Sequence, residues 1–323
     1  MFVTKIRADS SDDRSPFGDF FFAPLGGKTA AGLPVTPDSA VTLAAVYRAV
    51  SLISGHMALL PLVLKHAGTN KRITGHAVQQ LFKRPNAWQN GFDWRRFLVV
   101  CLLLRGNSYC EIIDDPRGRI LALNPLHPDA VTTERVTSGD YRFKVKSPDG
   151  TTRTLTRDRV WHLRGLSLDG ITGLSVIAVA RESLSTGLAA QAYGNRYFAN
   201  DARPSSGWLS DPGKFADKAT KDAFRDAVKD AQSAANRGKM MVLEHGIEYH
   251  DVAVSNADAQ FLESRKFSVD DVARWFGVPP HKLASLDRAT FSNIEQQSLE
   301  YVNDGLLIWA HVIEAGIEAD LLF

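Results

Sequence analysis

The sequence predicts an α+β protein, because helical and strand-like periodicities occupy separate blocks of the chain. Apolar residues recur at three- and four-residue spacing after Ser39, and from about residue 107 the spacing changes to two. A further block at 201–256 combines a charged helix with short strand-like runs. The 323 residues are too many for one small core, so we expect two or three compact units.

The helices are recognised by apolar stripes and by residues that cap or stop a helix. The first is expected from Ser39 to Pro61, with Val46, Ala49 and Ile53 on one face. By the same criteria, further helices are expected at 91–104, 174–200, 212–236, 257–276 and from Ser292 towards Ala315. The helix at 212–236 carries charges of both signs, which indicates a solvated face rather than a nucleic-acid footprint.

Residues 107–163 are expected to form an antiparallel β layer against the preceding helices. Their alternating runs are separated by turn sequences, such as Asp114 to Gly118 and Ser147 to Gly150. The expected strands of this layer are 109–113, 120–123, 141–146 and 160–163. In the later block, 206–209 is a strand candidate, and 239–243 and 247–254 are expected to pair with each other.

The composition excludes several classes of protein. Thirty-eight Lys and Arg against thirty-six Asp and Glu leave a formal charge of +2, too little for a protein held on nucleic acid by counterion release alone. Two cysteines, Cys101 and Cys110, exclude a disulfide scaffold and a CxxC site, and we interpret them as reduced core thiols of an intracellular protein. The longest apolar run, at 97–104, is far shorter than the ~20 residues of a membrane helix.

Motifs that would carry catalysis or bind a metal are incomplete. Gly27-Lys28-Thr29 is similar to the end of a phosphate loop, but Phe22 stands where that loop needs a glycine. The densest cluster of possible metal ligands is Glu244, His245, His250 and Asp251. On one strand the two histidines point to opposite faces, so they do not easily share an ion. The sequence therefore predicts no catalysis, no cofactor and no metal site.

Several short patterns occur in a fixed order along the chain. They include Leu60-Pro61-Leu62, Arg84-Pro85-Asn86 with Phe92, Leu104 to Tyr109, Leu123 to Pro128, Val160 to Leu163 with Gly170 to Ser175, and Tyr197 to Asn200 with Pro204 to Leu209. The most specific are Gln260 to Lys266, Phe276 to Pro280 and Ser292 to Gln296. In this order and spacing they resemble the HK97-type bacteriophage portal proteins, over the range from Val35 to Leu322.

The chain departs from the family pattern at three places. Val176 stands where a proline usually follows the serine, and Trp309 where the last helix often has a proline. The sequence stops at Phe323, where many relatives continue into a C-terminal crown, so we expect the crown to be short or missing.

The resemblance implies a portal-like subunit with a mixed α/β wing, long stem helices and a small α/β clip. Its expected parts are a flexible N-terminal arm at 1–40, the wing at 41–173, stem helices at 174–200 and 257–276, the clip at 201–256, a tunnel loop at 277–292, and a C-terminal helix at 293–323 that returns to the wing.

The resemblance also implies a function without catalysis. The subunits would form a ring, usually of twelve, at one capsid vertex, as the channel for packaging and ejection of double-stranded DNA. The implied partners are the terminase large subunit, the major capsid protein, a head–tail connector and DNA that passes non-specifically, with no membrane. The implied location is the virion, and the host cytoplasm during assembly. The residues expected to line the channel at the tunnel loop are His281, Lys282, Ser285, Asp287, Arg288 and Thr290.

Elementary electrostatics agrees with a conduit, because every phosphate that a channel neutralises would hold the DNA back. A nearly neutral chain with a loop of mixed charge suits such a channel better than a clamp. The alternatives are another virion ring such as a head–tail adaptor, a DNA-binding protein that forms no ring, and a nucleotide-dependent enzyme built on Lys28.

Overall fold

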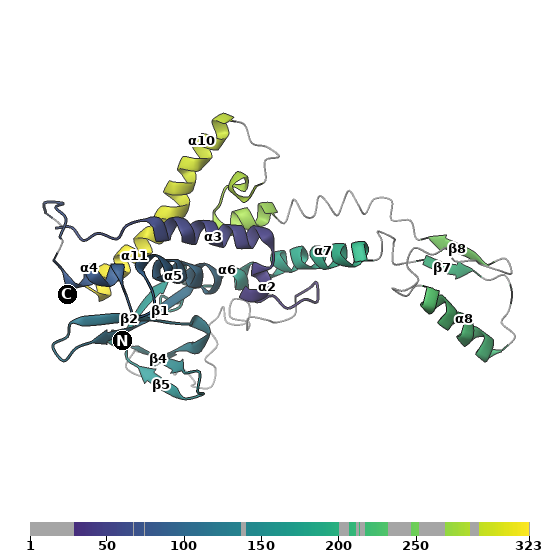
Figure 1. The fold of residues 1–323 in the computed structure, drawn as a ribbon, viewed down its shortest axis with the longest axis horizontal. Coiled ribbons are helices and arrows are strands. Elements are labelled where there is room, and N and C mark those ends of the chain that lie inside the picture. Colours follow the sequence, from purple (N-terminus) through teal and green to yellow (C-terminus); the bar gives the residue numbers. More distant parts are fainter. Residues whose placement is uncertain are drawn as a thin grey trace, which may run out of the picture. The chain divides into compact units, whose positions relative to one another are not determined.

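The computed structural model describes residues 29–66, 68–73, 75–136, 140–199, 207–210, 213, 217–231, 247–251, 269–284 and 291–322 (Figure 1). The chain divides into two compact units, one of Met1–Thr186 with Lys266–Phe323 and the other of Gly187–Arg265. Helices and antiparallel sheets are both present, so the α+β fold class is confirmed. In the described part of the chain, no helix is long and apolar enough to cross a membrane.

The first unit opens with helices α2 (Pro37–Val41), α3 (Ala44–Leu59), α4 (Ala77–Lys83) and α5 (Gly91–Arg105). The predicted apolar face of the first helix is confirmed, because Val46, Ala49 and Ile53 are all buried, and α3 packs along α5. The side chain of Asn90 accepts a hydrogen bond from the backbone N–H of Asp93 and so caps the start of α5.

The beginning of the described chain differs from the expected flexible arm at 1–40. Thr36 and Ser39 cap α2 reciprocally, since each side chain accepts a hydrogen bond from the other residue's backbone N–H. Val35 and Ala40 are buried. The arm prediction is therefore wrong from about residue 35 onwards, where capping and burial order the backbone. The helix expected without a break from Ser39 is also divided, between α2 and α3.

The described β structure of the first unit consists of two antiparallel three-stranded sheets rather than one layer. The first has the order β2-β1-β6, from Ile120–Leu126, Asn107–Asp114 and Val160–Arg164; the second has the order β3-β4-β5, from Val131–Arg135, Tyr141–Lys146 and Thr152–Leu155. The 3-10 turn Pro128–Ala130 follows β2 and directs the chain out of the first sheet. Strand β5 was not predicted because most of its side chains are exposed, so it lacks apolar alternation.

The central strand β1 is buried on both faces. Tyr109 packs edge-on against Phe143 of the second sheet at 5.6 Å, and Glu111 accepts two 2.6 Å hydrogen bonds from the Arg153 guanidinium of β5. Cys110 points the other way, towards Trp94 of α5. Strand β1 therefore holds α5 and the second sheet together, one on each side.

The two cysteines are free and buried, as core thiols should be. Burial raises the pKa of both Cys101 and Cys110 to about 12, so neither forms a reactive thiolate near neutral pH. In the same core, Trp94 stacks on Trp161 at 5.5 Å. The Trp161 indole N–H donates to the carbonyl of Gly316, which attaches the last helix to the sheet.

The chain next forms α6 (Val176–Val179) and α7 (Arg181–Ala199). One continuous helix was expected at 174–200, but the backbone leaves the helical geometry at Ala180. The Ser175 hydroxyl caps α6 by accepting from the backbone N–H of Ala178.

The second unit contains β7 (Gly207–Ser210), α8 (Lys218–Ala231) and β8 (Glu248–Asp251). Strands β7 and β8 pair in antiparallel fashion, while the expected partner strand at 239–243 lies outside the described residues. The prediction of a solvated face on α8 is confirmed, because its described charged side chains are exposed: Lys218, Lys221, Asp222, Arg225, Asp226 and Asp230.

The chain returns to the first unit through a helix at 269–276, α10 (Phe291–Glu300), the π-helical turn η5 (Tyr301–Leu306) and α11 (Leu307–Asp320). One continuous helix was expected from Ser292 towards Ala315, but the π-helical turn η5 divides this stretch into α10 and α11. A π-helical turn holds an extra residue, and such turns frequently mark functional sites.

Two glycines allow α5, β1 and the chain before α6 to meet. Gly106 has φ of 74°, and a Cβ placed on it would lie 2.2 Å from the carbonyl oxygen of Leu174. A Cβ on Gly173 would lie 2.0 Å from the carbonyl oxygen of Gly106. Backbone therefore packs directly on backbone at this junction.

We predict that Gly106→Ala lowers the free energy of unfolding by about 3–4 kcal/mol, from the left-handed backbone and the backbone overlap together. The control is Gly118→Ala, where φ is 77° but no atom lies within 4 Å of the added methyl group. It should cost only the conformational part, about 1–2 kcal/mol. Urea unfolding followed by tryptophan fluorescence measures both; equal losses would contradict the packing argument.

His162 of β6 is a buried neutral histidine. It stacks on Tyr109 at 4.4 Å, and its Nε2 lies 3.0 Å from the amide oxygen of Asn107. Its Nδ1 is buried and has no hydrogen-bond partner in the part of the chain that the structure describes. Burial, and secondarily the charge of Arg164, lowers the pKa of His162 to about 3. Below pH 6.5 the His162 ring is therefore protonated in the unfolded chain but stays neutral in the folded chain.

Stability should therefore fall as the pH falls below 6.5. Between pH 7 and pH 5 we predict that His162 costs the wild type about 2 kcal/mol of unfolding free energy. His162→Phe keeps an aromatic ring without the titration, and its stability should fall by that much less over the same range. Urea unfolding at the two pH values measures the difference. An equal loss of unfolding free energy in both proteins would show that folding does not lower the pKa of His162.

Candidate functional site

The candidate site is the foot of the predicted tunnel loop, where the helix at 269–276 ends and the chain turns back towards α10. Val272, Ala273 and Phe276 of this helix are buried. The Ser183 hydroxyl of α7 donates to the Asp271 carboxylate at 2.8 Å. The helix before the loop is therefore fixed to the first turns of α7.

The loop begins with the 3-10 helix η4 (Pro280–Leu283). Pro279 and Pro280 stop the preceding helix, as the sequence predicts, and the backbone N–H of Lys282 donates to the carbonyl of Pro279 at 3.0 Å. Leu283 is buried, and Ala284 adopts φ of 65°, a left-handed conformation that is uncommon for alanine. The chain thus turns sharply as it leaves η4.

Lys282 is anchored from two sides. The Arg48 Nε of α3 donates to its carbonyl oxygen at 3.2 Å, and its ammonium lies 5.3 Å from the centre of the Tyr301 ring. Tyr301 is buried in η5, and its hydroxyl lies 3.1 Å from Nδ1 of His56 on α3.

His281 is anchored separately on α10. Its Nδ1 lies 2.9 Å from the amide oxygen of Gln297, and because an amide oxygen only accepts, Nδ1 carries the proton. The Nε2 atom is buried and has no partner among the described residues.

The electrostatics of the foot favour anchoring over proton transfer. Burial, followed by the charges of Lys282 and Arg48, lowers the pKa of His56, so the ring is neutral near pH 7. Burial raises the pKa of Tyr301 to about 12, which keeps its hydroxyl protonated. Two cations and two neutral rings therefore hold the start of the loop.

The structure locates two of the six predicted loop residues. His281 and Lys282 lie half-buried at the foot of the loop, engaged with α3, α10 and η5. Ser285, Asp287, Arg288 and Thr290 lie outside the described residues. That these six residues line a DNA channel stays a prediction.

Sequence reasoning missed the residues that hold the loop: Arg48, His56, Gln297 and Tyr301. Arg48 and His56 meet their partners across 234 and 245 positions of sequence. No local pattern marks contacts of that range. The histidine and lysine after the two prolines were visible, but their anchors were not.

The other sequence candidates form no site in the described residues. Gly27 and Lys28 lie outside them, and Thr29 is buried with its hydroxyl donating to the carbonyl of Leu33. Glu244 and His245 also lie outside. Within the described part of the chain, no three His, Cys, Asp or Glu side chains are grouped as metal ligands would be.

Solved structures share the fold of this chain. The fold is shared with an HK97-family phage portal protein from Corynebacterium diphtheriae, with a TM-score of 0.63 and 19% identity over 86% of this chain and 87% of that one. It is also shared with a chain in the neck of a native gene transfer agent particle computed with C12 symmetry, with a TM-score of 0.59 and 22% identity over 88% of this chain and 80% of that one.

The family follows from sequence. The family described as "Phage portal protein" matches residues 44–323, and the chain belongs to this family. It is 34% identical to the probable portal protein of Streptomyces phage phiC31 over 93% of this chain and 68% of that protein. It is 27% identical to the portal protein of Enterobacteria phage HK97 over 83% of this chain and 64% of that protein. The resemblance seen in the sequence is thus confirmed.

We predict that Tyr301→Leu loosens the loop without unfolding the unit, because it removes the ring face beneath Lys282 and the hydroxyl beside His56. Tryptic cleavage after Lys282 or Arg288 should accelerate about tenfold. Loss of the two contacts lowers the free energy of local opening by about 1.4 kcal/mol, which corresponds to that factor. The control is Tyr47→Leu, which removes an exposed tyrosine of α3. Mass spectrometry of the fragments identifies the cut; equal rates in both variants would contradict the anchoring role.

Proposed function

We propose that this chain assembles into a closed ring of twelve copies at one vertex of a capsid and forms the channel through which double-stranded DNA is packaged and ejected. The observation that carries the proposal is the family match over 44–323. The C12 symmetry of the gene transfer agent neck, which contains a chain of the same fold, supports the subunit number.

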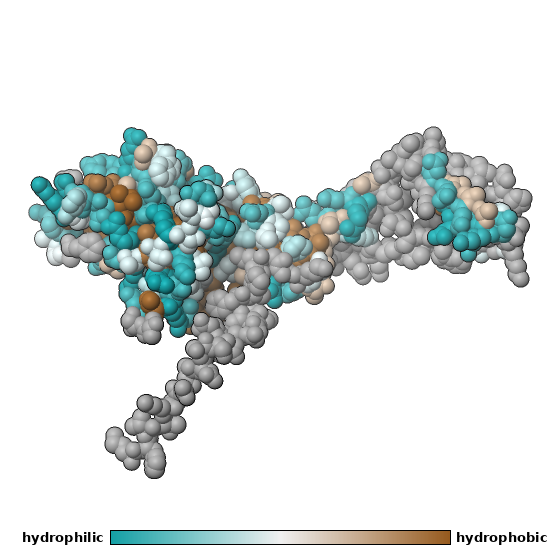
Figure 2. All heavy atoms as spheres, turned by 90° about the horizontal axis from the view of Figure 1, so that it is seen from below, coloured by the Kyte–Doolittle hydropathy of each residue, from teal (hydrophilic) through white to brown (hydrophobic). Residues whose placement is uncertain are grey.

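Exposed apolar side chains supply a driving force for assembly. Four apolar side chains in the ten residues from 299 to 308 are about half exposed: Leu299, Val302, Leu307 and Ile308. Figure 2 shows hydrophobic residues interrupting a mainly hydrophilic surface on one face. Because each is already about half buried, burial of the rest contributes about 1 kcal/mol per side chain. In a ring, each subunit would bury them against its neighbour in a head-to-tail interface. Such an interface gives a closed ring when the rotation from one subunit to the next adds up to a full turn.

The charge of the loop suits passage rather than capture. Asp287 offsets one of the two positive charges of Lys282 and Arg288, and the whole chain carries a net charge of only +2. Phosphates that meet such a loop are steered weakly and released easily. The role in this proposal is structural, without catalysis.

The partners follow from the proposed place in the particle. The terminase large subunit and a head–tail connector would dock on the ring during and after packaging, and the major capsid protein would surround it in the virion. The exposed, mixed-sign surface of α8 suits polar and exchangeable contacts of the kind that successive partners need. Assembly would take place in the host cytoplasm.

Light scattering of the purified chain at two salt concentrations, with negative-stain images of the same sample, tests the proposal. We expect closed rings with a central hole.

Lys282→Ala combined with Arg288→Ala should assemble the same rings but package DNA poorly in an infection assay, while Lys218→Ala with Arg225→Ala on α8 serves as a charge-matched control. A monomer that binds duplex DNA tightly, with a steep salt dependence, would overturn the conduit. Normal packaging by the loop variant would overturn the loop assignment alone.

A further inference from the structure

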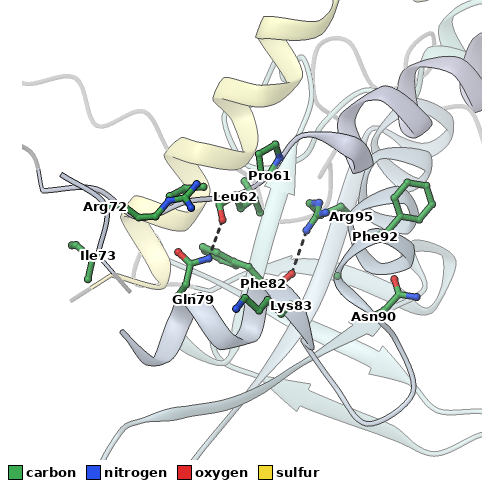
Figure 3. Close-up of a pocket in the computed structure, with 12 residues that line it drawn as sticks. Pro61, Leu62, Arg72, Ile73, Gln79, Phe82, Lys83, Asn90, Phe92 and Arg95 are labelled. Atoms are coloured by element: carbon green, nitrogen blue, oxygen red, sulfur yellow. Dashed lines mark hydrogen bonds between the residues drawn. The ribbon is translucent and has the colours of Figure 1, made fainter. Parts of the chain in front are cut away.

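An open groove of about 570 Å³ lies beside the C-terminal end of α3 (Figure 3). Its apolar lining comes from Pro61 and Leu62 after α3, Phe82 at the end of α4, and Phe92 at the start of α5. Leu59 and Leu60, next to it in sequence, are 70% and 45% exposed. Two exposed leucines therefore directly precede the groove residues Pro61 and Leu62 in the sequence.

The groove is also strongly positive. Its described lining includes Arg72, Lys83 and Arg95 and no carboxylate. Arg95 donates to the carbonyls of Ala58, at 3.1 and 2.7 Å, and Phe82, at 3.2 Å. These three bonds fix the guanidinium, but neutral carbonyls do not cancel its charge. Figure 3 places Arg72 and Arg95 towards opposite ends of the groove.

The surrounding sequence reinforces this charge. Between positions 65 and 96 the chain has seven Lys or Arg and one Asp, although the net charge of all 323 residues is only +2. A ligand that fits such a groove is negatively charged and carries large apolar side chains.

The N-terminal segment at 9–25 has this composition. It contains four Asp and one Arg, together with Phe17, Phe20, Phe21, Phe22 and Leu25. We infer that residues 9–25 dock in the groove between α3, α4 and α5 of their own chain, with the phenylalanines on Leu62, Phe82 and Phe92 and the aspartates beside Arg72 and Lys83.

The reach of the chain permits this docking. Residue 29, where the described chain begins, shortly precedes α2, which adjoins the start of α3, whereas the groove lies at the other end of α3. The 16 residues of α3 span about 24 Å. Phe20, nine residues before position 29, reaches up to about 30 Å in an extended chain. Because the segment is tethered, its effective concentration at the groove is high, and weak contacts suffice to keep it there.

Cross-linking of the full chain tests the inference. Phe20→Cys is combined with Ile73→Cys, a half-buried position in the groove lining, and treated with a flexible bismaleimide. The native Cys101 and Cys110 do not interfere, because both are buried thiols. The control combines Phe20→Cys with Lys146→Cys, an exposed position on β4.

We expect an intramolecular cross-link in the groove pair, at about ten times the rate of the control pair. A bound segment keeps the two cysteines close together, whereas a free segment brings them together only by random collision. Arg72→Glu with Lys83→Glu should bring that rate down to the control level. Adding Asp12→Lys and Asp13→Lys to the same protein should restore it, because the charges are then exchanged rather than lost.

Three results would overturn the inference. Equal rates in the groove and control pairs would show that the segment does not bind there. Cross-links only between chains would assign the groove to the segment of a second copy. A rate unaffected by the charge reversal would remove the electrostatic basis of recognition. None of these results depends on whether the protein packages DNA, so this inference and the proposed function stand or fall separately.

Discussion

The rest of the first unit depends on the burial of β1 on both faces. Glu111 and Tyr109 face the second sheet, and Cys110 faces Trp94 of α5. Because a strand covered on both sides leaves no free face, the helices and the second sheet are set in place relative to it. The last helix joins the same core when the Trp161 indole donates to Gly316. Segments that are far apart in the sequence thus share one compact unit.

This compact unit determines where the predicted tunnel loop begins. Arg48 and His56 of α3 and Tyr301 of η5 hold Lys282 at the foot of the loop, and all of them belong to the unit built on β1. The strongest positive charge of the chain is gathered elsewhere, in the basic stretch at 65–96. The predicted tunnel loop and the basic groove therefore have different chemistry. The loop carries mixed charge, whereas the groove combines an apolar floor with cations that no carboxylate of its described lining neutralises.

Local patterns predicted those elements whose own residues carry the signal. Helix α5 was predicted at 91–104 and is observed at Gly91–Arg105, because its apolar run and the glycine that ends it, Gly106, lie within it or next to it. The division into two sheets was missed because it depends on how strands pair after the turn at Pro128–Ala130. The break at Ala180 and the π-helical turn at Tyr301–Leu306 were missed because neither is marked by a proline.

The sequence by itself determined the α+β class, most helices and strands, the buried thiols and the family, since periodicity, capping residues and ordered motifs are all properties of neighbouring residues. Only the tertiary structure decided that His281 and Lys282 are anchored by Gln297, Tyr301 and Arg48, and that Arg72, Lys83 and Arg95 line one groove. The reason is physical: packing around β1 brings together side chains that are far apart in the sequence, and no local pattern records which distant residues will meet.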